Sequence, residues 1–442
     1  MAPRTLDKKA LHSDIPDDII RCEILPRFPF KLATRFKVIS KKYHGLLTNN
    51  AILNARQARL CPPCPALIHM DHPDTDKVEA MDVLSSTPDI VGIPSGFEFL
   101  CCCLENGFLC LLASTNGLVL ILYNPSNATS NFQLPILFIA NPATQKAQPI
   151  PGSAEHITRF DTCTGLAFDP VDNDREKTVS KFKIVKAHGA RTIEDNGTKF
   201  CFAIFSSNTG CWAMSSATVS MDTKINCRNK KVAYGNGIMY WDYQELLLWF
   251  DIATDVAGII KLPWILLDVQ VKGPIRHDVD TSADGTLVCT AIDKDGLTVY
   301  HLVGRSIDFH WELKHERRWL DVMKDSIAAF GFCHSMQLRS GLRTERLTER
   351  RLIRPIGVEN GRFVYIGVRQ EWKAKDRILR YDMVNGKTYD IGKELGNRYS
   401  MRPFYVYRNS MVDIPPIVVP IQGQICEGNA GGCICAIYAE ED

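Results

Sequence analysis

Residues 236–263 read NGIMYWDYQELLLWFDIATDVAGIIKLP, and this stretch shows the pattern that decides the fold of most of the chain. Two apolar runs, at 237–241 and 246–250, are each about as long as a β-strand and are separated by a short polar connection. The second run ends in the turn-forming residues 251–254, and a further apolar run then leads to Leu262-Pro263. The stretch therefore predicts consecutive antiparallel strands joined by tight turns.

The same turn, followed by a strand, recurs along the chain. Turns led by Asn, Ser or Asp, with Thr or Gly inside them, also occur at 141–144, 207–210 and 382–386. Further strand-like runs lie at 107–112, 117–123, 182–185, 200–205, 286–292 and 361–368. Many short strands of this kind are typical of a sandwich, a barrel or a propeller. About 300 residues of such strands are too many for an ordinary sandwich, whereas blades of roughly 40–50 residues predict a β-propeller of about six to seven blades.

The composition is that of an ordinary globular protein. The 442 residues are 45% hydrophobic and 23% charged, with a formal net charge of +2, which excludes a globally disordered, collagenous or coiled-coil chain. Sixteen cysteines are scattered along the chain, and no apolar run follows the N-terminal charges, so neither a disulfide scaffold nor a signal peptide is predicted. We therefore expect a cytoplasmic or nuclear location, or both. The most apolar stretch, 246–271, is interrupted by charged residues, so no membrane span is predicted.

Charge divides the chain near residue 60. Residues 1–60 hold 12 Lys or Arg against 5 Asp or Glu, a net charge of +7. Residues 61–130 hold one Lys against 8 Asp or Glu, a net charge of −7. The second part opens with Cys61-Pro62-Pro63-Cys64-Pro65, which cannot continue a helix. A domain boundary is predicted at this point.

Three short helices are predicted before the boundary. Pro16 followed by Asp17 and Asp18 places a proline in a first helical turn and two acids at the positive end of the helix dipole, and Pro29 ends this helix. Apolar spacing predicts a second helix at 31–40 and a third at about 41–47. Helices of this length bury little surface alone, so the module needs a partner or the rest of the chain.

This helical module resembles an F-box over about residues 13–52. The resemblance rests on residues 15–29, which read IPDDIIRCEILPRFP, and on later positions that include Leu32, Val38 and Tyr43. An F-box docks onto the Skp-type adaptor of SCF (Skp, cullin, F-box) ubiquitin ligases. The sequence departs from the pattern at Ile15, usually Leu, at Tyr43, usually Trp, and at Pro26, late in the first helix. The resemblance implies an adaptor-facing surface made by Ile15, Pro16, Ile19, Ile24, Leu25, Pro29, Leu32, Val38 and Tyr43.

Residues 97–410 resemble the F-box-associated domain of the large plant F-box family, a kelch-like propeller. The resemblance rests on the turns and strands described above and on their order behind an F-box. It implies a three-helix F-box followed by a β-propeller-like domain, with a linker at 53–96 and a disordered tail at 411–442. The implied function is that of the substrate-recognition subunit of an SCF-type E3 ubiquitin ligase. The F-box would bind the adaptor, and through it cullin, while the propeller binds an unknown protein substrate and no residue of this chain is catalytic.

Two other functions stay open at this point. The first is a non-enzymatic, protein-binding propeller whose degenerate F-box packs internally and is not engaged in a ligase. The second is a propeller hydrolase or lyase, for which the sequence offers only scattered His and Asp residues. No nucleophile-elbow, zinc-protease, phosphate-loop or dinucleotide motif occurs in the sequence, which disfavours the second function.

Neither a cofactor, a metal nor a nucleic acid is predicted as a ligand. Cys61, Cys64, His69 and His72 are of zinc-ligand type, but the four residues between Cys64 and His69 are too few for the usual finger. The basic residues of the helical module are too few to indicate nucleic-acid binding. Residues 337–355 carry a net charge of +4 and are predicted as an exposed helix or a disordered insert.

Overall fold

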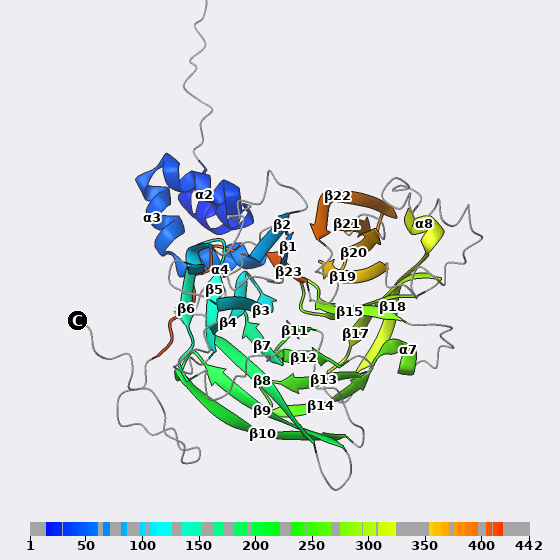
Figure 1. The fold of residues 1–442 in the computed structure, drawn as a ribbon. Coiled ribbons are helices and arrows are strands. Elements are labelled where there is room, and N and C mark those ends of the chain that lie inside the picture. Colours follow the sequence, from blue (N-terminus) through cyan, green and yellow to red (C-terminus); the bar gives the residue numbers. More distant parts are fainter. Residues whose placement is uncertain are drawn as a thin grey trace, which may run out of the picture.

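The computed structural model describes residues 15–28, 30–60, 65–70, 81–85, 98–101, 107–125, 135–152, 163–170, 181–191, 197–221, 231–243, 246–266, 275–293, 295–305, 308–323, 353–370, 375–396, 404–408 and 410–418. In this part of the chain, a module of short helices precedes a β-propeller, and Figure 1 shows the helices against one edge of the propeller. The predicted order of a helical module followed by a propeller is therefore confirmed.

The helical module begins with a helix whose winding changes twice. α1 (Asp17–Ile19) continues into the π-helical turn η1 (Ile20–Ile24) and then into the 3-10 turn η2 (Leu25–Arg27). Pro26 lies in the first turn of η2, whose own hydrogen bond from Phe28 to Leu25 does not require the N–H that proline lacks. α2 (Phe30–Ile39) and α3 (Lys41–Asn49) match the second and third predicted helices. A further helix, α4 (Ala51–Leu60), extends beyond them.

Five four-stranded antiparallel sheets form the blades of the propeller. Blade 1 contains β3 (Gly107–Thr115), β4 (Leu118–Pro125), β5 (Ile136–Asn141) and β6 (Lys146–Pro149). Blade 2 contains β7 (Thr164–Phe168), β8 (Phe182–Arg191), β9 (Thr198–Ser206) and β10 (Cys211–Met221). Blade 3 contains β11 (Val232–Gly235), β12 (Ile238–Asp242), β13 (Leu246–Asp251) and β14 (Val256–Lys261). Blade 4 contains β15 (Arg276–Thr281), β16 (Leu287–Ile292), β17 (Gly296–Val303) and β18 (His310–Arg318). Blade 5 contains β19 (Ile353–Glu359), β20 (Phe363–Gln370), β21 (Lys375–Asp382) and β22 (Lys387–Gly396).

A three-stranded sheet joins the two ends of the chain beside these blades. It has the order β2–β1–β23 and pairs β1 (Pro65–Met70) with β2 (Met81–Ser85) and with β23 (Tyr405–Arg408). The first strands of the blades contact one another in the sequence β3, β7, β11, β15 and β19, and β23 lies between β19 and β3. The ring of innermost strands is therefore closed by a strand from the C-terminal part of the chain, which is paired to one that follows the helices (Figure 1).

The structure has five four-stranded blades, fewer than the six to seven predicted. The prediction divided the chain by a uniform blade length, but much of the sequence lies between blades. The largest such interval runs from the end of β18 at Arg318 to the start of β19 at Ile353. The short helices α7 (Pro263–Leu266) and α8 (Trp319–Met323) lie in such intervals, and α5 (Glu98–Cys101) precedes blade 1. The predicted linker and tail ranges stay predictions, although β1, β2 and most of α4 lie within 53–96 and described residues continue to 418.

The repeated turns predicted from the sequence join the third and fourth strands of the blades. In three of them the first residue caps the turn: the Oδ1 atoms of Asn141, Asp251 and Asp382 accept a hydrogen bond from the backbone N–H two residues on, at 2.9–3.0 Å. Short Asx side chains favour this geometry because they reach their own backbone. In blade 2, the turn at 207–210 lies between β9 and β10 in the same way. The internal repeat is therefore confirmed as the outer hairpin of the blades.

Burial explains why some strands could be predicted and others could not. Middle strands such as β12 and β16 are buried along their whole length, because each blade is covered by a neighbour on both faces. Outer strands such as β6 and β10 are mostly exposed or half-buried. Between blades 2 and 3, Phe202 stacks on Phe250 at a centroid distance of 4.7 Å and lies 5.7 Å from Trp241. The cores of the propeller therefore lie between the blades.

Candidate functional site

The predicted adaptor-facing residues fall into three groups. Five are exposed, among them Val38 (89%), Ile15 (53%) and Ile19 (46%), and the other two are Pro16 and Leu32. Ile24 and Tyr43 are half-buried, whereas Leu25 is 1% exposed and lies in the core of the helical module. Pro29 lies outside the described residues.

The exposed residues come from two segments that meet at the start of α3. Lys42 in the first turn of α3 forms an ion pair with Asp17 in α1. Asp17 stands between Ile15 and Ile19 in the sequence, so this pair brings their segment to the start of α3. Val38 and the equally apolar Ile39, which is 69% exposed, end α2 directly before the same turn. The ring of Tyr43 packs edge-on against Phe36 at 5.9 Å, and Phe36 lies 5.2 Å from Phe28. The rings of Phe28, Phe36 and Tyr43 thus pack together inside the helical module, whereas the aliphatic side chains of Val38 and Ile39 are exposed to solvent.

A buried cluster of one lysine and two aspartates lies where two innermost strands meet. The Nζ atom of Lys231 lies 3.0 Å from Asp278 and 2.8 Å from Asp280, and the Lys231 side chain is 2% exposed. The Lys231 Nζ atom also lies 5.6 Å from the centre of the Tyr405 ring. Burial raises the pKa of Asp278 to about 6, although the neighbouring Lys231 acts in the opposite direction. The ion pairs of Lys231 with these two carboxylates join blades 3 and 4, which are neighbours in the ring, and both aspartates share the one cation.

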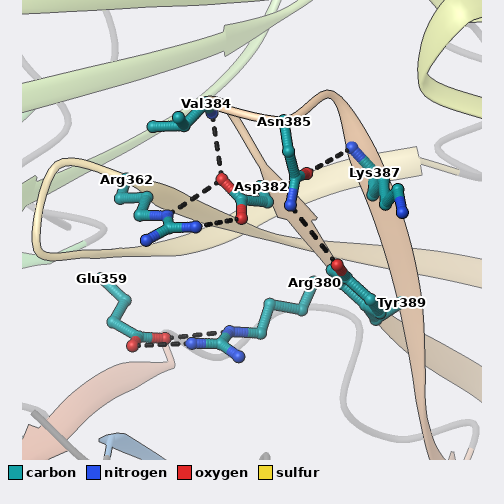
Figure 2. A network of polar contacts seen from close by, with 8 residues as sticks. All are labelled: Glu359, Arg362, Arg380, Asp382, Val384, Asn385, Lys387 and Tyr389. Atoms are coloured by element: carbon teal, nitrogen blue, oxygen red, sulfur yellow. Dashed lines mark hydrogen bonds and ion pairs between the residues drawn. The ribbon is translucent and has the colours of Figure 1, made fainter.

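A second polar network lies in blade 5, and Figure 2 shows its two arginine–carboxylate pairs. Arg380 donates to both carboxylate oxygens of Glu359 at 3.1 and 2.8 Å, and Arg362 donates to both of those of Asp382 at 3.1 and 2.7 Å. The guanidinium carbons of Arg380 and Arg362 lie 3.6 and 4.8 Å from the centre of the Phe363 ring. The hydrogen bonds from Arg362 lower the pKa of Asp382. Because Asp382 also caps the outer hairpin, this network fixes the turns of blade 5 rather than presenting free groups to a ligand.

The sequence did not predict the Lys231 cluster, because its members are far apart in the chain. One signal was present: Asp278 and Asp280 alternate with His277 and Val279, which places two acids on one face of β15. The described residues do not include several other parts of the chain that the sequence analysis discussed: Cys61, Cys64, His72, most of 337–355 and all of 419–442. Among the residues that the structure describes, no cluster of three metal-ligating side chains occurs, and no helix is long and apolar enough to cross a bilayer.

One family model matches the propeller part of the chain, and several solved structures are distantly similar. Residues 100–333 match a family model described as F-box protein At3g26010-like, beta-propeller, and no curated protein matches the chain. A crystal structure of a protein from Lactobacillus plantarum is similar at 12% identity and a TM-score of 0.34, covering 78% of this chain and 100% of that one. A putative 6-phosphogluconolactonase from Bacteroides uniformis is similar at 8% identity and a TM-score of 0.34, covering 78% and 99%.

Proposed function

Because the chain belongs to the F-box protein At3g26010-like β-propeller family, we propose that it is the substrate-recognition subunit of an SCF-type ubiquitin ligase. The helical module would bind a Skp-type adaptor, and through it cullin, while the propeller would hold a protein substrate. The family match covers the propeller, so the role of the helices rests on their own sequence and surface.

The observation that carries the proposal is the set of exposed apolar side chains on α1, α2 and the residue before α1. Ile15, Ile19, Leu32 and Val38 are exposed although each is a residue that folding would normally bury. Exposed apolar side chains gathered on one face are typical of protein-binding sites. Arg35 and Lys41 are exposed on the same helices and would attract an acidic partner during encounter.

Ubiquitin transfer would need no catalytic group in this chain. The subunit would contribute by holding a substrate close to the conjugating machinery, which converts an encounter in solution into a reaction between bound partners. The Lys231 cluster and the blade 5 network support this division of labour, because their charged groups are paired with one another. We expect the subunit to act where such ligases assemble, in the cytoplasm, the nucleus or both.

We also count the sheet β2–β1–β23 as a sixth, three-stranded blade, which brings the propeller to the lower end of the predicted range. This count is supported by the position of β23 between β19 and β3 and by its pairing with β1. Closing the ring with strands from both parts of the chain would make the propeller one rigid support for the substrate. Slow hydrogen exchange in β1 and β23, comparable with that of β12, would agree with this count, and rapid exchange would contradict it.

The direct test is the affinity of the purified full-length chain for a Skp-type adaptor, measured by calorimetry. In Val38→Asp, a carboxylate without a partner would be buried at the interface, so we expect the dissociation constant to rise by roughly tenfold or more. The matched control is Val384→Asp, because Val384 is also a highly exposed valine but lies in the outer hairpin of blade 5. We expect the control to bind like the wild type. Equal affinity of both variants, or no binding by the wild type, would contradict the proposal.

The runner-up is a protein-binding propeller whose helical module does not engage an adaptor. The packing of Tyr43 against Phe36 favours it, because this aromatic side chain is already partly used inside the module. The same calorimetric experiment separates the two functions. A wild-type chain that folds but does not bind the adaptor would support the runner-up.

A further inference from the structure

The core of the helical module is not made by the helices alone. Its buried residues include Leu25, Phe30, Leu47 and Leu53 from the helices, and Met411 from beyond the last strand of the propeller. Met411 is 3% exposed in this cluster. We call residues 410–418, which follow β23, the C-terminal strap. Because the strap supplies one of the side chains that fill the module, the module's packing depends on the far end of the described chain.

Two buried amides hold the strap in place at Met411. The Oε1 atom of Gln57 in α4 accepts a hydrogen bond from the backbone N–H of Met411 at 3.1 Å. The Nδ2 atom of Asn141 in blade 1 donates to the carbonyl oxygens of Ser410 and Val412, at 3.0 and 2.7 Å. Gln57 and Asn141 are both fully buried. The backbone on both sides of Met411 is therefore fixed by side chains from two different parts of the fold.

Asn141 departs from the blade repeat in a way that matches this contact. The equivalent turn residues in blades 3 and 5 are Asp251 and Asp382, and all three use Oδ1 to cap the turn. A carboxylate can cap the turn but cannot donate a hydrogen bond, whereas the amide of Asn141 does both. The blade that faces the strap thus carries the side chain that can bind two backbone carbonyls.

Further contacts carry the strap along the propeller. Gly117 has a φ of +89°, and a Cβ at this position would lie 2.2 Å from the Cβ of Ser410, so the turn between β3 and β4 leaves room for the strap. Lys146 in β6 forms an ion pair with Asp413 at 2.6 Å. The backbone N–H of Val418 donates a hydrogen bond to the backbone carbonyl oxygen of Ser207 at 2.9 Å. Ile414 and Ile417 pack against the core between blades 1 and 2. Figure 1 shows this segment descending from the helices along the edge of the propeller.

We propose that Asn141, Gln57 and Met411 are positioning residues that make the adaptor-binding surface conditional on closure of the propeller. Met411 reaches the helical module as the strap continues from β23, the strand that closes the ring. A chain that has not paired β23 would leave a gap in the core under α2, α3 and α4, and the module would open. The consequence for adaptor binding rests on the proposed function, whereas the coupling between strap and helices does not.

The test is Asn141→Asp in the full-length chain, with Asp251→Asn as the matched control. Asn141→Asp keeps the turn cap that Asp provides in blades 3 and 5, but it places a negative charge against two carbonyl oxygens. Asp251→Asn makes the reverse change in a turn that caps itself in the same way. We expect amide hydrogen exchange in residues 30–60 to accelerate by roughly tenfold or more in Asn141→Asp, because two buried hydrogen bonds are lost. The control should exchange like the wild type.

Two further readouts separate the possible explanations. All seven tryptophans lie beyond residue 200, so tryptophan fluorescence reports on the propeller and not on the helical module. We expect it to stay unchanged in Asn141→Asp. Met411→Asp should accelerate amide hydrogen exchange in the helices in the same way. Met411→Leu should exchange like the wild type, because leucine fills the same apolar space.

Amide hydrogen exchange in residues 30–60 tests the coupling between strap and helices, whereas adaptor affinity tests the proposed function. Unchanged exchange in residues 30–60 of both Asn141→Asp and Met411→Asp would overturn the inference, whatever the adaptor does. Faster exchange with a weaker adaptor affinity would support both the inference and the proposed function, since only the closed fraction of the module would bind. Faster exchange in a chain that never binds the adaptor would support the strap as the positioning element of the helices and would contradict the proposed function.

Discussion

The helical module and the propeller place their apolar side chains in opposite ways. Half of the fourteen large apolar side chains that are exposed in the described part of the chain belong to residues 15–60: Ile15, Ile19, Leu32, Val38, Ile39, Ile52 and Leu60. The rest of the described chain contributes the other half from a far longer stretch, and large aromatic residues of the propeller such as Trp241 and Phe250 are fully buried. The propeller therefore completes its own interior, whereas the module leaves apolar surface that a second protein could cover.

The largest expected effect comes from opening the interior of the propeller at Lys231. Lys231→Met would leave Asp278 and Asp280 buried without their cation, and we expect the free energy of unfolding to fall by about 3–5 kcal/mol. The measurement is urea unfolding followed by tryptophan fluorescence. Lys314→Met is the control, because Lys314 is half-exposed and pairs with Glu312 at the surface, and its midpoint should match that of the wild type. A Lys231→Met midpoint equal to that of the control would show that the cluster does not stabilise the propeller.

The strands that the sequence predicted are those that the propeller buries on both faces. β12 and β16 are largely apolar because they lie in the middle of a blade, and the turns could be predicted because their chemistry is local. The sheet β2–β1–β23 was not predicted, since β1 pairs with β23 across most of the chain and no local pattern encodes that pairing. The strap was assigned to a disordered tail for a related reason. It is extended, and its partners Asn141 and Gln57 are hundreds of residues away.

The exposure of the candidate adaptor-facing residues could be predicted only in part, and the reason is again structural. Helical spacing treated Ile19 and Leu25 alike, but η1 is π-helical between them and turns the later residues to another side. Leu25 therefore points into the core, while Ile19 stays exposed. A change of winding within one helix is not encoded in apolar spacing, so this difference needed the structure.

A smaller effect is expected from pH, and it should have opposite signs at two aspartates of the propeller. Burial raises the pKa of Asp278 to about 6, whereas an unfolded aspartate titrates near 4, so the folded chain binds this proton more tightly. The stabilisation that protonated Asp278 provides is complete below pH ~4 and is lost as the pH rises through about 6. The loss should be about 1–3 kcal/mol, since a tenfold change in proton affinity corresponds to about 1.4 kcal/mol.

The measurement is the difference in unfolding free energy between the wild type and Asp278→Asn, followed from pH 2 to pH 7. This difference should fall as the pH rises. Asp382→Asn is the counterpart, because the hydrogen bonds from Arg362 lower the pKa of Asp382 and its stabilisation is lost as the pH falls below about 4. A flat difference curve for Asp278→Asn would mean that Lys231 fully compensates the burial of this carboxylate.

The propeller and the helical module can be compared directly by truncating one valine in each, Val364 and Val38. Val364 in β20 is fully buried between Val358, Ile366 and Leu379, among others. Val364→Ala removes two methyl groups from this core, and we expect it to lower the free energy of unfolding by about 2 kcal/mol. Urea unfolding followed by tryptophan fluorescence measures the change, because blade 5 belongs to the part of the chain that carries the tryptophans. A loss well below 1 kcal/mol would indicate that this core is loosely packed.

Val38→Ala is the same chemical change at the end of α2, and it should have the smallest effect on folding. Val38 is 89% exposed, so its methyl groups lose little on truncation, and we expect the unfolding free energy to stay within about 0.5 kcal/mol of the wild type. Affinity for the adaptor should nevertheless weaken by roughly tenfold, because the two methyl groups would be buried in the complex. If Val38→Ala instead destabilised the chain as much as Val364→Ala without changing adaptor affinity, then Val38 would serve the module's own packing, and its surface would not be the docking site. The valine pair therefore decides whether the exposed apolar face belongs to the fold or to a partner.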